Sequence, residues 1–152
     1  MSDWSLRLAR LADAEAMAAP ALAAARGPAD YARLIRKGHS LVAHVGEALA
    51  GFLVTEPFGR ELHLWELRVA APLQDGGIGR GLVRASLIDA RNTGLRAVTL
   101  TTDRESAPFY AGLGFKEVTA LDAHPRLAGE LANEVDDGMD AERRCAMICF
   151  LD

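Results

Sequence analysis

The sequence predicts one mixed α/β domain built on a single central sheet, and three observations predict it. The chain has 152 residues, of which 50% are hydrophobic and 25% are charged. At this length one domain buries roughly 70% of the surface of its unfolded chain. Apolar residues recur with the period of a strand in some segments and with the period of a helix in others, and the two kinds alternate. No repeat, low-complexity tract or linker interrupts them, so residues 1–152 are expected to form a single domain.

The first half of the chain reads as two helices inserted into a run of strands. Asp13 starts an alanine-rich stretch with a helical pattern. Proline is favoured at the first position of a helix and glycine just after its end, which predicts a second helix from Pro28 to Arg36, closed by Gly38. The expected elements are a strand over 4–11, helices over 13–26 and 28–36, and strands over 40–46, 48–57 and 61–70.

The second half begins with a glycine-rich stretch and an amphipathic helix that runs to about Asn92. Leu82, Val83, Leu87 and Ile88 form the apolar side of this helix. The elements expected after it are a strand over 95–102, a short helix over 107–111, a strand over 115–118, a loop and helix over 124–137, and a strand over 143–151.

Composition excludes several classes of function. The formal net charge is −4 and the sequence pI is about 5.6, so the chain lacks the concentrated Lys and Arg that bind nucleic acid. Cys145 and Cys149 fit neither a zinc pattern nor a redox pair and are expected to be reduced core thiols, with no metal bound. No segment approaches the ~18 uncharged apolar residues of a membrane span. Asp13 and Glu15 interrupt the only stretch that resembles a signal peptide, and a cytoplasmic location is expected.

The stretch LQDGGIGRGLV, residues 73–83, places four glycines within six positions and leads directly into a helix. A dinucleotide-binding Gly-x-Gly-x-x-Gly is absent, because the third position after Gly77 and Gly79 is Leu82. A P-loop is absent as well, since no lysine follows Gly81. Two interpretations remain: glycines that only permit an unusual turn, and a cradle of backbone N–H groups for a pyrophosphate at a helix N-terminus.

Two ordered motifs favour the cradle. The frame Gln74-x-x-Gly77-x-Gly79 resembles the pyrophosphate-binding signature of the GNAT superfamily of N-acetyltransferases. The segment SAPFYAGLGF, residues 106–115, resembles the Phe-Tyr-x-x-x-Gly-Phe segment found late in the same fold. One helix and one strand separate the two motifs, as that fold requires.

The resemblance implies a fold, a co-substrate and a reaction. The fold would be a mostly antiparallel mixed sheet, splayed in the middle, with helices on both faces. The co-substrate would be acetyl-CoA, and the acetyl group would pass directly to a primary amine of a small molecule or peptide. The residues implied in acetyl-CoA binding are Leu67, Arg68 and Val69 for the acetyl and pantetheine arm, Gln74, Asp75, Gly76, Gly77, Ile78, Gly79, Arg80 and Gly81 for the pyrophosphate, and Ser106 and Tyr110.

The resemblance also implies catalytic residues. Tyr110 stands where the family carries the tyrosine that protonates the leaving thiolate, and it is the preferred catalytic residue; the alternative is a core tyrosine packed between Phe109 and Phe115. His63 lies on the strand where related enzymes carry a histidine that takes the proton of the amine through water, and its ordinary pKa near 6.5 suits a base. Glu66 is the alternative base, but strand alternation places it on the face opposite His63, Trp65 and Leu67.

The acceptor stays open at this stage. Tyr31, Phe58, Trp65, Glu56 and the stretch 124–126 could line its pocket, but each could equally be core or surface. Two further hypotheses belong to other classes: an acyl-CoA-binding module without turnover, and a structural or interaction domain. A homodimer paired through edge strands is compatible with the expected fold, but the sequence does not show one.

Overall fold

A seven-stranded sheet forms the centre of the structure, a computed structural model that describes residues 3–152. The strand order is β1-β2-β3-β4-β5-β7-β6. Neighbouring strands are antiparallel except β4 and β5, which are parallel. The strands are β1 (Ser5–Leu8), β2 (Leu41–Val45), β3 (Ala48–Phe58), β4 (Glu61–Val69), β5 (Ala97–Asp103), β6 (Lys116–Glu117) and β7 (Arg144–Phe150).

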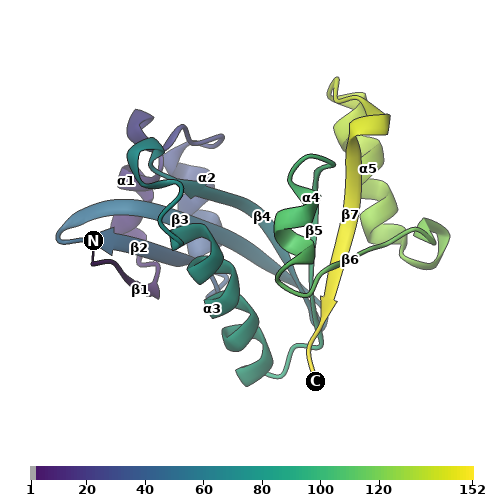
Figure 1. The fold of residues 1–152 in the computed structure, drawn as a ribbon, viewed down its shortest axis with the longest axis horizontal. Coiled ribbons are helices and arrows are strands. Elements are labelled where there is room, and N and C mark those ends of the chain that lie inside the picture. The colour runs from purple at the N-terminus through teal and green to yellow at the C-terminus, as the bar shows by residue number, and fades with distance from the viewer. Residues whose placement is uncertain (1–2) are drawn as a thin grey trace.

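Helices cover both faces of the sheet, as the resemblance implied. Helices α3 and α4 lie in front of the sheet in Figure 1, and α1, α2 and α5 lie behind it. The helices are α1 (Ala14–Met17), α2 (Pro28–Ile35), α3 (Ile78–Asn92), α4 (Ala107–Ala111) and α5 (Pro125–Asp136). Among residues 3–152, no helix has both the length and the apolarity needed to cross a bilayer.

The sheet divides into two halves where β4 and β5 part. The two strands pair only from Glu61 opposite Ala97 to Leu64 opposite Leu100. Beyond that point both strands continue, β4 to Val69 and β5 to Asp103, without pairing to each other, and Figure 1 shows them diverging. The expected splay in the middle of the sheet is therefore confirmed.

A β-bulge in β4 shifts the side chains at the point of divergence. Val54 pairs with Glu66 and Thr55 pairs with Leu64, which leaves Trp65 as the extra residue. Because one inserted residue interrupts the alternation of faces, Trp65 and Glu66 both reach the side covered by α1 and α2, where Arg26 contacts them both. Leu67 packs in the cluster on the α3 side. The expectation that Glu66 lies opposite His63 and Trp65, with Leu67 on their side, is wrong for this reason.

The helix expected over 13–26 is also wrong. The segment forms the short helix α1 and a separate 3-10 turn at Pro20–Leu22. Proline lacks an N–H and clashes with the carbonyl four residues earlier, so Pro20 ends the helical path. Ala23, at φ 51°, then turns the chain with a left-handed conformation. The result is a bent loop over residues 24–27 that leads into α2.

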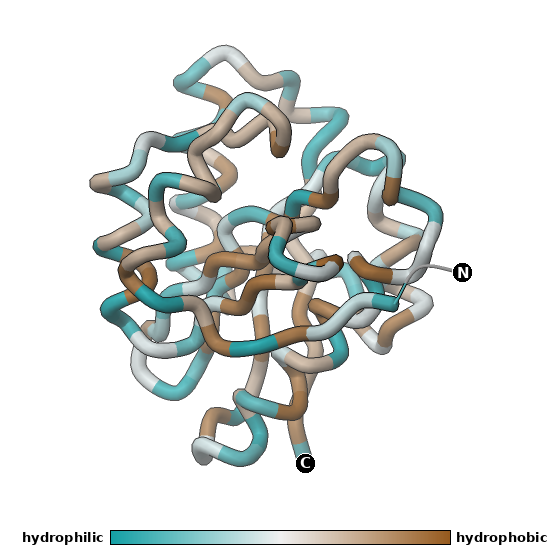
Figure 2. The backbone as a smooth tube through the Cα atoms, turned by 90° about the vertical axis from the view of Figure 1, so that its left-hand side faces the viewer, coloured by the Kyte–Doolittle hydropathy of each residue, from teal (hydrophilic) through white to brown (hydrophobic). Residues whose placement is uncertain are grey.

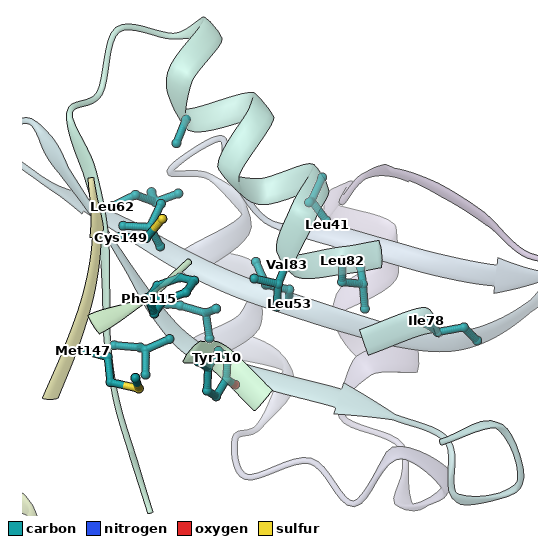
Figure 3. Close-up of a cluster of buried hydrophobic side chains, with 14 of the residues drawn as sticks. Leu41, Leu53, Leu62, Ile78, Leu82, Val83, Tyr110, Phe115, Met147 and Cys149 are labelled. Atoms are coloured by element: carbon teal, nitrogen blue, oxygen red, sulfur yellow. The ribbon is translucent and has the colours of Figure 1, made fainter. Parts of the chain in front are cut away.

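Two apolar clusters fill the two sides of the sheet. The larger one joins α3 and α4 to the sheet, and Figure 3 shows it around Leu53, Leu82, Val83, Phe115 and Met147. The smaller one joins α1 and α2 to the other side of β2 and β3. The hydrophobic segments accordingly gather in the middle of the tube in Figure 2, with hydrophilic segments around them. Both cysteines are free and buried, which confirms the expected core thiols.

Candidate active site

The first part of the site is the open edge of β4 beyond its last pair with β5. The N–H of Ala70 donates to Ala50 of β3 at 2.8 Å. Because successive residues of a strand present their backbone groups to opposite sides, Arg68 also faces β3, and Leu67 and Val69 face the opening. Leu67 and Val69 can therefore pair with an extended ligand arm, whereas the backbone of Arg68, which was also expected there, is occupied by β3.

The second part is the start of α3, where several backbone N–H groups have no partner in the helix. Gly77 precedes the helix with φ +87°, a left-handed conformation that glycine tolerates. The first helical hydrogen bond runs from the N–H of Gly81 to Gly77 at 2.9 Å. The N–H groups of the residues before Gly81, namely Ile78, Gly79 and Arg80, consequently point out of the helix end, where its dipole favours an anion.

A pocket of about 260 Å³ lies over this helix end. Its walls include Phe109 of α4, the first residue of the Phe-Tyr motif, which was not among the expected site residues. A Cβ built on Gly79 would lie 3.7 Å from Val69, 3.8 Å from Leu67 and 3.8 Å from Phe109. Gly79 therefore lies where the helix start, the open edge of β4 and α4 meet around one space. The pocket is lined by Gln74, Asp75, Gly77, Gly79, Arg80 and Phe109.

Not all of the expected pyrophosphate residues have a free group to offer. The N–H of Gly76 donates to Leu73 at 3.2 Å, and that of Gly81 is used in the helix. A Cβ on Gly81 would lie 2.5 Å from Cη2 of Trp4, so this glycine serves close packing. The N–H groups of Gly76 and Gly81 are thus engaged within the protein, and a pyrophosphate would meet those of Ile78, Gly79 and Arg80 instead. The side chain of Gln74 donates to the carbonyl of Val69 at 3.3 Å and fixes the loop to β4.

Tyr110 lies on α4 beside the open end of the splay. The ring packs edge-to-face against Phe109 and Phe115, with centroids 5.0 and 5.7 Å away, and is 8% exposed. Figure 3 shows it at the margin of the cluster, near Phe115 and Met147. Burial, aided by the negative charge of Asp103, raises the pKa of Tyr110 to about 12. The phenol is therefore fully protonated at neutral pH and can act as a proton donor.

Ser106 precedes α4 and is half-buried. Its backbone N–H donates to the carboxylate of Asp103 at 2.7 Å, which fixes the turn between β5 and α4. The side chain takes part in no hydrogen bond within residues 3–152, so its hydroxyl is available to a ligand, as expected.

His63 lies in a setting that does not suit a base. The side chain is 1% exposed, and its Nδ1 lies 2.8 Å from Oγ1 of Thr99 and 3.1 Å from Nη1 of Arg126. Because a guanidinium can only donate, Nδ1 is the acceptor and the ring is neutral. Burial and the positive charges of Arg126, His124 and Arg26 lower the pKa of His63 to about 3. The expectation that His63 removes the proton of an amine loses its chemical support.

The carboxylate of Glu66, the alternative base, accepts hydrogen bonds from four donors. Its carboxylate accepts from the N–H of Ala25 at 2.9 Å, Nη1 of Arg26 at 2.8 Å, the hydroxyl of Tyr31 at 2.8 Å and Nε of Arg68 at 2.7 Å. Burial would raise the pKa of Glu66, but these donors outweigh it and hold the pKa below its ordinary value. Glu66 thus remains ionised and anchors residues 25 and 26 to the sheet. Sequence reasoning missed this role because the bulge that enables it has no local signature.

A cluster of aromatic rings and arginines marks the other side of the splay. The rings of His63 and Trp65 have centroids 4.5 Å apart, and Phe58 lies 6.3 and 6.2 Å from them. Arg126 of α5 lies over Phe58 at 4.8 Å, and Arg26 lies over Trp65 at 5.9 Å. These contacts gather the segment before α2, the β3–β4 turn and α5 around the base of the splay.

The other residues that were expected to line the pocket for the acetyl acceptor have different roles in the structure. Tyr31 is 0% exposed and belongs to the core, so it cannot line a pocket. Glu56 accepts from Nε1 of Trp65 at 3.0 Å. Within 124–126, His124 and Arg126 both bind Glu61 at 2.8 Å and fix the start of α5 to β4.

The chain belongs to the acetyltransferase (GNAT) family, whose sequence model matches residues 9–115. This range contains the splay, the helix start with its glycines, and Tyr110.

Solved acetyltransferase structures have the same fold. The ribosomal-protein-S18-alanine N-acetyltransferase of Escherichia coli is 16% identical with a TM-score of 0.74, over 99% of this chain and 95% of that one. The N-acetylglutamate synthase of Neisseria gonorrhoeae, in complex with coenzyme A and N-acetyl-glutamate, is 18% identical with a TM-score of 0.77, over 100% of this chain and 36% of that one. The PaiA N-acetyltransferase of Thermoplasma acidophilum, in complex with coenzyme A, is 15% identical with a TM-score of 0.71, over 97% and 99%. At these identities the likeness is one of fold.

Proposed function

We propose that this protein is an N-acetyltransferase that moves the acetyl group of acetyl-CoA directly to a primary amine of a small molecule or peptide. The observation that carries the proposal is the juxtaposition at the splay. Free N–H groups at the start of α3, an unpaired backbone edge on β4 and Phe109 of α4 meet around one space, and the protonated Tyr110 lies next to Phe109 with ring centroids 5.0 Å apart.

Each chemical group of acetyl-CoA has a matching group in the protein around this pocket. Its pyrophosphate matches the N–H groups of Gly77 to Arg80 and the positive end of the helix dipole, and Arg80 can add a charge-assisted contact. The carboxylate of Asp75 has the same sign as a pyrophosphate, so Asp75 would contribute only its backbone. The pantetheine arm, which carries amides, would pair with the backbone groups of Leu67 and the N–H of Val69 like an added strand. That CoA-bound relatives share the fold supports this placement.

The reaction needs a proton for the sulfur when the thioester opens. A neutral amine nitrogen forms a bond to the acetyl carbon, and the C–S bond breaks with its electron pair on sulfur. The hydroxyl of Tyr110 then donates its proton to the departing sulfur as a general acid. A donor whose pKa is raised holds its proton until the thiolate forms.

Kinetics of Tyr110→Phe test this proposal. Release of free thiol from acetyl-CoA would be followed with a panel of aliphatic and aromatic primary amines. Acid catalysis contributes about 100-fold or more, so we expect the variant to lose about 100-fold in kcat while its Kd for acetyl-CoA stays unchanged. An amine-dependent rate that Tyr110→Phe leaves intact would contradict the role of Tyr110. Binding of acetyl-CoA with no turnover of any amine would favour the non-catalytic acyl-CoA-binding module instead.

A further inference from the structure

Helix α5 carries three charged residues at intervals of four, Arg126, Glu130 and Glu134, which places them on one face. The two outer ones contact β5. Nη2 of Arg126 donates to Oγ1 of Thr99 at 2.9 Å, and the carboxylate of Glu134 accepts from the hydroxyl of Thr101. Glu130 stands midway between them and therefore faces β5 between Thr99 and Thr101.

This level of β5 is the point where the sheet opens. Leu100, between the two threonines, is the partner of Leu64 in the last pair that joins β4 to β5. The thioester expected in the splay would end at this point, between the open edge of β4 and Tyr110. Glu130 thus lies at the base of the splay, on the face opposite α3, where an acceptor could approach.

Glu130 has no partner within the described part of the chain. No hydrogen bond or ion pair among residues 3–152 engages its carboxylate, although the side chain is half-buried. The charges that act on it come from Arg126 and Glu134 of its own helix and from Arg26 across the site. At this level β5 presents the neutral Thr99 and Thr101, and Arg144 of β7 binds Glu134 at 3.0 Å and Thr101 at 3.5 Å. Burial and Glu134 raise the pKa of Glu130 more than Arg126 and Arg26 lower it, so its pKa lies above the ordinary value.

The two other candidate bases already use their acceptor atoms in hydrogen bonds within the protein. His63 is neutral and its Nδ1 accepts from Arg126, and Glu66 accepts four hydrogen bonds. Glu130 is the carboxylate of this region that is both unpaired and partly accessible.

We propose that Glu130 receives the acceptor amine at the base of the splay, by pairing with its ammonium form and taking its proton. This inference rests on the proposed function. The ammonium transfers one proton to the Glu130 carboxylate, and the free lone pair of the nitrogen forms the N–C bond. The sulfur leaves with the electrons of the C–S bond and takes the proton of Tyr110. The second nitrogen proton restores the Tyr110 hydroxyl, and Glu130 returns its proton to solvent when the amide leaves.

The test uses benzylamine as the acceptor probe, because its ring can stack on the Phe58 and Trp65 side of the site while its ammonium meets a carboxylate. Wild type, Glu130→Gln and Asp136→Asn would be compared. Asp136 is exposed at the end of the same helix, so its variant makes the same change of charge outside the site. Three quantities are measured: kcat/KM for benzylamine at saturating acetyl-CoA from pH 6 to 9, the Kd of acetyl-CoA, and the ¹³C resonance of the Glu130 carboxyl carbon with and without benzylamine.

We expect Glu130→Gln to lower kcat/KM about 100-fold, to make the remaining rate rise with pH across this range as the fraction of free amine rises, and to leave the Kd of acetyl-CoA unchanged. Asp136→Asn should match the wild type, and the Glu130 resonance should shift when benzylamine is added. A Glu130→Gln variant that keeps the wild-type rate and profile, or a resonance that does not respond in a protein that binds acetyl-CoA, would overturn the inference. Failure of the wild type to bind acetyl-CoA would instead overturn the proposed function.

Discussion

At the scale of one residue, His63 makes the stability of the fold sensitive to acid. Its ring is buried and neutral, and it fixes Thr99 and Arg126 through Nδ1. The folded-state pKa, about 3, lies below the ordinary value of 6.5. Below pH 6.5 His63 therefore becomes protonated in the unfolded chain but stays neutral in the folded chain. The free energy of unfolding consequently decreases as the pH falls from 6.5 towards 3.

This loss of stability in acid can be tested with His63→Asn. The Oδ1 of the asparagine can replace Nδ1 as a hydrogen-bond acceptor, but the side chain does not titrate. Between pH 7.5 and 5 the wild type should lose about 2 kcal/mol of unfolding free energy through His63 alone. The variant should show a pH dependence weaker by that amount in urea unfolding at the two pH values. Equal pH dependence in both proteins would mean that the ring is charged or exposed in the folded state.

At the scale of elements, α3 has two distinct glycine functions within one turn. Gly79 lines the pocket at the helix start, whereas Gly81 lets Trp4 cross the helix. The sequence presents both simply as glycines of one stretch, and only the packing of the N-terminal segment separates them.

Gly81→Ala should therefore destabilise the fold without touching the cradle. A Cβ only 2.5 Å from the Trp4 ring forces the ring or α3 to move, and such overpacking costs about 1–3 kcal/mol. Gly129→Ala is the matched control: the position lies within α5 with no atom within 4 Å of the new Cβ, so it should stabilise by up to about 1 kcal/mol. Urea unfolding measures both. A Gly81→Ala variant as stable as the wild type would contradict the packing role.

Some helices and strands could be predicted from the sequence alone and others could not. The long strands and α3 follow from strong periodicity, and the two motifs predicted the splay and the helix start. The helix over 13–26 failed because Pro20 outweighed a favourable alanine-rich composition. The bulge at Trp65 depends on pairing with β3, and the position of Glu130 depends on α5 lying over β5. Neither follows from local pattern, since both require the strand order.

At the scale of the whole molecule, the sheet opens between two packed halves, and we propose that the reaction takes place in this opening. The β1–β4 half supplies the open backbone edge, and the β5–β7 half supplies Tyr110 and, through α5, Glu130. Helix α3 closes the far end with its free N–H groups. The central claim is that this opening binds acetyl-CoA with its pyrophosphate at the start of α3.

Calorimetric titration of acetyl-CoA into the wild type, Gly79→Glu and Gly129→Glu tests that claim most directly. A Cβ at position 79 makes only ordinary contacts and one at 129 makes none, so both variants should fold. The glutamate at 79 would place a negative charge in the cradle, and we expect acetyl-CoA to bind this variant about 100-fold more weakly than the wild type. Gly129→Glu should bind as the wild type does. Equal binding by all three proteins, or no binding to the wild type, would contradict the account.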